Sequence, residues 1–182
     1  MNIELLLETS YDQVAERAKF THFLPLIAER FARQHLATLA RVEGKADAGV
    51  PIVLFLSVRN AGRSQMALGW FNLVVDGRAI GWSGGSEPSS HINPSVVEAM
   101  QEVGSYIEGE FPKPWTDEML RAADVVVTMG CGDACPTLPR TRYEDWQFDD
   151  PAGLGGEAVR AIRDAIGERV RGLVARLELP VA

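Results

Sequence analysis

The feature that most constrains the fold is an apolar segment that leads directly into a glycine-containing turn and then a helix. Residues 51–58 read PIVLFLSV, a nearly continuous apolar run typical of a central parallel strand that is covered on both faces. The turn that follows contains Asn60 and Gly62, and a helix is predicted from about residue 63 to residue 75. This order predicts a strand–turn–helix unit of an α/β protein.

The rest of the chain continues the alternation of strands and helices. Further strands are predicted at 79–83, 124–129 and 143–148, and further helices at 93–103, 116–123 and 156–177. Strands separated by helices imply right-handed crossovers, so we expect a doubly wound four-stranded parallel sheet with helices on both faces. Ligands then bind at the carboxyl ends of the strands. Residues 1–45 are predicted to form an N-terminal helical extension, and residues 50–182 the α/β domain.

Composition and charge exclude several classes of protein. The chain has 182 residues, 46% hydrophobic and 24% charged, values typical of a globular domain rather than of a disordered chain. Its formal net charge of −7 argues against binding to nucleic acid. We find no basic leader and no apolar run near the roughly 20 residues of a membrane span, so we expect a cytoplasmic protein. The extension carries balanced charge and is expected to pack on the domain or to mediate a homodimer.

The turn after the first strand has the composition of an anion-binding loop. Residues 57–64 read SVRNAGRS and join the strand tip to the helix start, where free backbone N–H groups and the positive end of the helix dipole converge. Asn60 and Gly62 tolerate positive φ, which allows consecutive N–H groups to turn inward. Arg63 adds a planar two-pronged donor suited to a tetrahedral oxyanion. The glycines and lysine of a nucleotide P-loop are missing, and the alternative to an anion site is a plain tight turn.

The chain contains two cysteines, Cys131 and Cys135, separated by four positions. Two cysteines this close cannot form the disulfide framework of a secreted protein. Taken alone, they are either buried thiols, a redox pair or half of a zinc site. The zinc site is disfavoured because a second pair is missing and the three histidines lie in distant segments, so no metal is expected.

Four ordered segments together resemble a known family. The segment VLFLSVRNAGRSQMA is similar to the phosphate loop of the low-molecular-weight protein tyrosine phosphatases and of the arsenate reductases that share their fold. The same resemblance extends to INPSVVEAM at 92–100, VVVTMGCGDACP at 125–136 and YEDWQFDDPAG at 143–153, and covers about residues 50–177. The cysteine segment and the run WQFDDP point to the thioredoxin-coupled arsenate reductases rather than to phosphatases acting on phosphotyrosine. The fold implied is that of the low-molecular-weight phosphatases.

The resemblance also implies a role for individual residues. In the family a cysteine thiolate occupies the position of Ser57 and attacks the oxyanion, and Ser64 would hydrogen-bond this nucleophile. Asp150 aligns with the general acid, while Cys131 and Cys135 align with the second and third redox cysteines. The implied reductant is thioredoxin, or a mycothiol-like or glutaredoxin-like system, and no cofactor is implied. The residues that would surround the bound oxyanion are Val58, Arg59, Asn60, Ala61, Gly62, Arg63 and Ser64.

Ser57 is the main departure from the family pattern. A serine hydroxyl forms neither a stabilised thiolate nor a disulfide, so the chain is expected to bind arsenate, phosphate or sulfate without reducing arsenate. Two explanations are open: an engineered Cys→Ser change, favoured because the other residues are intact, or a natural non-catalytic oxyanion-binding or regulatory protein. A phosphomonoesterase is a further alternative.

Two other departures concern ligands. Arg59 stands where relatives often have histidine and is expected to strengthen anion binding. Leu68 replaces a potassium-binding glutamate of some relatives, so no potassium site is predicted.

Overall fold

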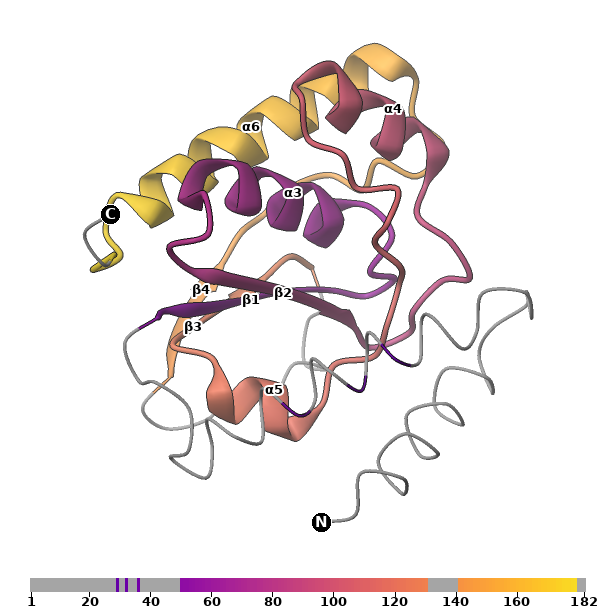
Figure 1. The fold of residues 1–182 in the computed structure, drawn as a ribbon. Helices are drawn as coiled ribbons and strands as arrows, with labels where there is room; N and C mark the ends of the chain where they lie inside the picture. Colours follow the sequence, from indigo (N-terminus) through magenta and orange to yellow (C-terminus); the bar gives the residue numbers. More distant parts are fainter. Residues whose placement is uncertain (1–28, 30–31, 33–35, 37–49, 131–140, 180–182) are drawn as a thin grey trace.

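The computed structural model describes residues 29, 32, 36, 50–130 and 141–179. Helices and strands are interspersed along the α/β domain (Figure 1). The elements are β1 (Ile52–Ser57), α3 (Arg63–Val75), β2 (Ile80–Gly85), α4 (Pro94–Glu102), α5 (Asp117–Ala122), β3 (Val125–Thr128), β4 (Arg142–Asp145) and α6 (Gly156–Val174). The predicted extension at 1–45 lies outside these residues, apart from three single positions. In the described part of the chain, no helix has the length and apolar character needed to cross a membrane.

The strands form a parallel sheet in the order β2-β1-β3-β4, which confirms the predicted doubly wound sheet. All six residues of β1 are buried, as expected for a strand with a parallel neighbour on each side and a covering on each face. The last strand is shorter than the predicted 143–148. The backbone N–H of Trp146 still bonds to β3, but the carbonyl of Phe148 accepts a hydrogen bond from Arg63, which directs this segment to the end of β1.

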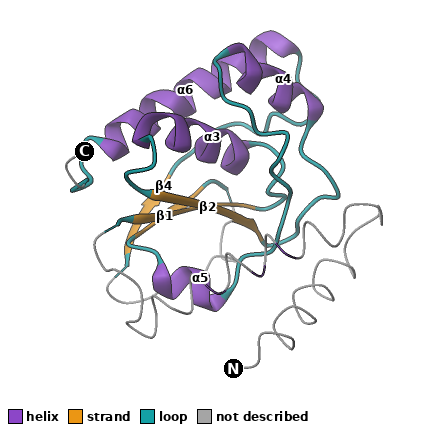
Figure 2. Ribbon diagram, viewed as in Figure 1, coloured by secondary structure: helices purple, strands orange, loops and turns teal. Residues whose placement is uncertain are grey.

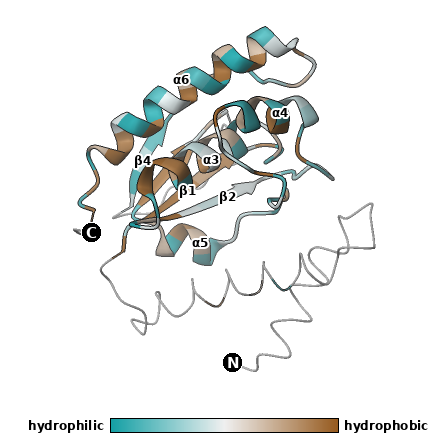
Figure 3. Ribbon diagram, turned by 45° about the horizontal axis from the view of Figure 1, so that its top comes forward, coloured by the Kyte–Doolittle hydropathy of each residue, from teal (hydrophilic) through white to brown (hydrophobic). Residues whose placement is uncertain are grey.

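Helices cover both faces of the sheet (Figure 2). The long helices α3 and α6, together with α4, lie on one face, and the short α5 lies on the other. Figure 3 shows hydrophobic and hydrophilic residues alternating along α6, as expected for a helix with one face on the core. Four aromatic residues are buried in the core: Trp70, Phe71, Trp82 and Trp146.

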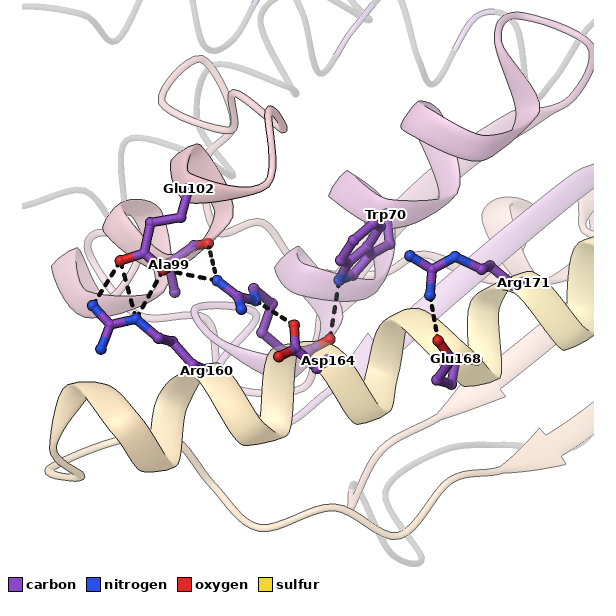
Figure 4. Close-up of polar contacts among 8 residues, drawn as sticks. Trp70, Ala99, Glu102, Arg160, Asp164, Glu168 and Arg171 are labelled. Carbon is purple, nitrogen blue, oxygen red and sulfur yellow. Dashed lines mark hydrogen bonds and ion pairs between the residues drawn. The ribbon is translucent and has the colours of Figure 1, made fainter.

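Polar contacts fasten α6 to α3 and α4 (Figure 4). The indole N–H of Trp70 on α3 donates to the carbonyl of Arg163 at 3.0 Å, and the Arg171 guanidinium lies 4.6 Å from the Trp70 ring. Glu102 at the end of α4 accepts hydrogen bonds from Arg160 and Arg163. The hydrogen bond from Arg160 and the neighbouring Arg163 lower the pKa of Glu102 to about 2.

Replacing two glycines of α6 by alanine should change the free energy of unfolding in opposite directions. A Cβ at Gly167 would lie 2.7 Å from Cε2 of the buried Trp70, whereas a Cβ at Gly172 would make an ordinary 3.5 Å contact with Arg176. We expect Gly167→Ala to lower the free energy of unfolding by about 1–3 kcal/mol through overpacking. The matched Gly172→Ala should raise it by roughly 0.5–1 kcal/mol, because alanine favours the helix. Urea denaturation measures both, and equal effects would contradict the tight α3–α6 contact.

Candidate functional site

The loop between β1 and α3 turns its carbonyl groups outward. Three of the carbonyls bond to backbone amides of residues 87–93 and one bonds to a side-chain amide. The pairs are Glu87 N to Val58 O (2.9 Å), Ser89 N to Arg59 O (2.9 Å), Asn93 N to Ala61 O (2.9 Å) and Gln65 Nε2 to Asn60 O (3.0 Å). No backbone N–H from residue 58 to residue 64 donates to any other residue that the structure describes. These amides thus stay available for an anion at the start of α3.

Asn60 holds the loop in this shape. Its φ of 47° lies in the left-handed region, which asparagine tolerates better than most residues and which the sequence predicted. The side chain is fully buried, and its Oδ1 accepts from the backbone N–H of Lys113 at 3.0 Å. Because a backbone N–H can only donate, this contact fixes the amide orientation, and Nδ2 donates to Ser64 Oγ at 2.9 Å.

The same network sets the direction of the Ser57 hydroxyl. Ser57 Oγ and Ser64 Oγ lie 2.8 Å apart, and both side chains are buried. Ser64 Oγ already accepts a hydrogen bond from Asn60. Among the described residues, Ser57 Oγ is the acceptor for the Ser64 hydroxyl proton. We therefore assign Ser64 as the donor, which leaves the proton of Ser57 free to point into the cleft. A thiolate at this position would receive the same hydrogen bond from Ser64.

Gly62 differs from its sequence-based interpretation. Its φ is −136°, so the loop does not use the left-handed conformation that this glycine was expected to supply. The glycine is needed for space: a Cβ would lie 2.7 Å from Cγ of Pro151. The absence of a side chain at Gly62 lets the 150–151 segment pack directly on the loop.

Arg63 links the loop to that segment. Its guanidinium donates to Phe148 O and to Asp150 Oδ2, each at 3.1 Å. The Arg63 side chain is 12% exposed and that of Asp150 51%, so the ion pair positions the carboxylate more than it stabilises the fold. The other carboxylate oxygen, Asp150 Oδ1, accepts from the backbone N–H of Ala152 at 3.0 Å.

These groups border an open cleft of about 860 Å³ at the carboxyl end of β1. Among the residues predicted for the site, those lining it are Ser57, Arg59, Ala61, Gly62, Arg63 and Asp150. The lining does not include Val58, Asn60 or Ser64. Asn60 and Ser64 are instead joined by a hydrogen bond that helps to hold the loop in shape. Arg59 is exposed at the cleft and is thereby accessible to a ligand.

The opposite wall was not predicted as part of the site. The sequence predicted residues 84–92 to lie between a strand and a helix and gave them no role in the site, although residue 92 begins the INPSVVEAM resemblance. This wall is lined by Pro88, Ser89, Ser90, His91, Asn93 and Pro94. Its position becomes apparent only from the hydrogen bonds between its backbone and the loop carbonyls.

Lys113 is a second contributor that sequence analysis missed. Its side chain is buried, with Nζ 3.5 Å from Ser83 Oγ and 3.5 Å from Glu110 Oε2 and stacked on the ring of Phe111. Its backbone carbonyl accepts from the N–H of Gly85 at 2.9 Å, so Lys113 joins the end of β2 to Asn60. A lone lysine in a loop carries no sequence signal for such a position.

Cys131 and Cys135 lie outside the described residues. Within the described ranges, no cluster of histidine, cysteine, aspartate and glutamate side chains is suited to a metal ion. The chemistry that the described groups support is the binding of a small oxyanion by backbone amides, hydroxyl groups and Arg63.

Comparisons with known proteins agree with this geometry. The family model described as low molecular weight phosphotyrosine protein phosphatase matches residues 52–181. An arsenate reductase of Bacillus subtilis is 38% identical over 130 residues, covering 66% of this chain and 92% of that protein. Arsenate reductase 2 of Staphylococcus saprophyticus is 36% identical over 123 residues, covering 65% and 92%.

Solved structures are similar over the same region. The thioredoxin-dependent arsenate reductase of Corynebacterium glutamicum superposes with a TM-score of 0.85 and 41% identity, covering 93% of this chain and 83% of that one. An arsenate reductase in a phosphate-binding state has a TM-score of 0.62 and 34% identity, covering 71% of this chain and all of the other.

The role of Asn60 predicts a specific loss. Asn60→Ala removes the bonds to Lys113 and Ser64 and places alanine at positive φ, so we expect the free energy of unfolding to fall by about 2–4 kcal/mol. The affinity for inorganic phosphate should fall as well, because the loop amides lose their fixed direction. Asn72→Ala, on the exposed side of α3, is the matched control and should change either quantity little. Urea denaturation and calorimetric titration measure the two quantities, and similar losses in both variants would contradict this role.

Proposed function

Because the chain belongs to the low molecular weight phosphotyrosine protein phosphatase family, we propose that it is an arsenate reductase whose nucleophile position holds Ser57. The observation that carries the proposal is the set of inward-facing loop amides beside Arg63 and Asp150, a cradle for a tetrahedral oxyanion. Several bacterial relatives are named arsenate reductases, which supports the choice of arsenate. The pair Cys131 and Cys135 supports reduction rather than hydrolysis.

The reaction needs two electrons, which two thiols supply when they become one disulfide. A thiolate at position 57 attacks arsenic, and Asp150 protonates the oxygen that leaves as water. The Cys131 thiolate then attacks the sulfur at position 57, arsenic leaves as arsenite with the electron pair of the broken bond, and a disulfide remains. Cys135 takes over the bridge to Cys131 by thiol–disulfide exchange. An external dithiol finally reduces that bridge.

Ser57 blocks this sequence at its first step. Oxygen at position 57 can accept the hydrogen bond of Ser64, but it cannot become the disulfide partner of Cys131. In the described part of the chain, the side chain that contacts Ser57 is the Ser64 hydroxyl, which is no base. The chain therefore binds oxyanion without turnover, and the oxyanion can be arsenate, phosphate or sulfate.

Thioredoxin is the reductant we propose. The Corynebacterium relative is described as thioredoxin-dependent, while a Synechocystis relative, 36% identical, is named a glutaredoxin arsenate reductase. A mycothiol-like system is a further alternative. The Corynebacterium structure covers 93% of this chain, which also supports a shared helical extension at residues 1–45. That this extension pairs two chains in a homodimer stays a prediction. We place the protein in the cytoplasm, where thiols are kept reduced.

Two other functions have specific support. The family description and a cleft far larger than an inorganic anion favour a phosphomonoesterase. The serine itself favours a natural oxyanion-binding or regulatory protein. The codon for position 57 in the source genome separates an engineered serine from a natural one.

The test restores the sulfur. Ser57→Cys should convert arsenate to arsenite in the presence of thioredoxin, thioredoxin reductase and NADPH, while the Ser57 protein should consume no NADPH above background. Cys131→Ser and Cys135→Ser, each in the Ser57→Cys background, should abolish multiple turnover, because each lacks one thiol of the relay.

The same variants distinguish the phosphatase. Hydrolysis of an aryl phosphate by Ser57→Cys that survives loss of both downstream cysteines, without arsenite formation, would contradict the reductase. The proposed reductase activity would also be contradicted if Ser57→Cys produced no arsenite with either thioredoxin or glutaredoxin.

A further inference from the structure

Lys113 is a buried charged side chain that the proposed reaction does not use. The side chain is only 4% exposed. Moving an ammonium out of water costs free energy, so an ammonium in the interior needs compensating contacts. The contacts of Nζ include Ser83 Oγ at 3.5 Å, Glu110 Oε2 at 3.5 Å and the ring of Phe111, whose centroid is 4.8 Å away. These contacts hold the ammonium at a defined position inside the protein.

This position is close to the start of the anion loop. In the register of β1 and β2, Ser83 pairs with Phe55, and Gly85 pairs with Ser57. Ser83 and Ser57 are thus two residues apart along the strands and one strand apart across the sheet, which separates their Cα atoms by about 8 Å. The ammonium contacts Ser83 but Lys113 is not part of the cleft lining, so it lies near the loop without reaching a bound anion.

Hydrogen bonds also join the 111–113 segment to the loop. The backbone N–H of Lys113 donates to Asn60 Oδ1 at 3.0 Å, and Gln65 Nε2 donates to both Asn60 O and Phe111 O. On the side of the segment, these bonds use backbone atoms and do not involve the ammonium. A neutral side chain at position 113 can therefore keep them, which separates the effect of the charge from that of the loop geometry.

Glu110 balances the charge of Lys113 incompletely at the loop. Its side chain is 34% exposed, and it lines a small pocket of about 250 Å³ beside α3 rather than the cleft. Water screens a partly exposed charge more strongly than a buried one. Of this ion pair, the ammonium therefore contributes more to the electrostatic potential at the loop, and that contribution is positive.

We propose that the buried charge of Lys113 selects doubly charged over singly charged oxyanions in the loop, without contact to the ligand. The inference rests on the proposed function, because it requires a tetrahedral anion to occupy the loop beside Arg63. Coulomb attraction is proportional to the charge of the ligand, so the ammonium acts twice as strongly on a dianion as on a monoanion at the same position. This selection needs no thiol and is present in the Ser57 protein.

Sulfate and perchlorate test the inference, because both are tetrahedral and stay doubly and singly charged, respectively, throughout the neutral pH range. Calorimetric titration of the full-length Ser57 chain measures both affinities. Lys113→Met removes the charge but keeps the backbone donor to Asn60 and an unbranched side chain. We expect it to weaken the binding of sulfate about fivefold and that of perchlorate only about twofold, the relation that follows from their charges.

Glu110→Gln is the complementary variant. It removes the carboxylate beside the ammonium and leaves Lys113 in place, so sulfate should bind about twofold more tightly. A merely structural role of the ion pair predicts the opposite sign, because loss of the contact would loosen the segment that holds Asn60.

Two control variants change the net charge by the same amounts at distant positions. Arg121→Met removes an exposed cation at the end of α5 that leads into the start of β3, at the sheet edge opposite the loop. Glu178→Gln removes an exposed carboxylate beyond the C-terminal end of α6. Both should leave the two affinities unchanged.

Equal losses for the two anions in Lys113→Met would indicate a structural role and overturn the inference. Unchanged affinities in that variant, or changes of the same size in the two controls, would also overturn it. If Lys113→Met does not fold, or perchlorate binds too weakly to measure, sulfate binding by Glu110→Gln decides, and unchanged or weaker binding overturns the inference. Absence of sulfate binding by the Ser57 chain would instead overturn the proposed function, and the inference with it.

Discussion

The site depends on the hydrogen bonds that turn the loop carbonyls of residues 58–61 away from the cleft. Those carbonyls bond to the 87–93 segment and to Gln65, so the amides of the same loop face the position where an anion would bind. An isolated tight turn has no such preference, because water satisfies carbonyl and amide groups equally well. The shape of the loop is therefore a property of two segments, and the proposed anion site depends on the return of the chain after β2 to the end of β1.

Net charge and local charge lead to different conclusions about partners. The chain carries −7 overall, yet the described lining of the cleft has two arginines, Arg59 and Arg63, and one acidic side chain, Asp150, beside several serine hydroxyls. Fixed dipoles at short distance act strongly on a small ion, while the net negative charge of the chain repels a polyanion. This arrangement favours small oxyanions over nucleic acid.

Much of the fold was predictable because it rests on local pattern. The apolar run of β1 and the capping residue Thr116, whose Oγ1 accepts from the N–H of Met119, identify their elements without tertiary information. The loop was predictable from residue types, and Asn60 has the positive φ that its type allows. The features that the sequence did not predict depend on distant contacts. Position 62 requires glycine because Pro151 packs against it, and the 87–93 segment is held at the site by hydrogen bonds to the loop carbonyls. Neither contact leaves a periodic pattern in the sequence.

Ser57 separates two functions that a cysteine would combine. In the proposed function, recognition of the anion depends on backbone amides, on Arg63 and on the hydrogen-bond chain from Lys113 through Asn60 and Ser64, and none of these involves sulfur. Electron transfer depends on one atom at position 57. A thiolate there would place a negative charge against the incoming dianion, whereas the serine hydroxyl can donate a hydrogen bond to it. Serine at position 57 should therefore favour binding of the anion while it prevents reduction.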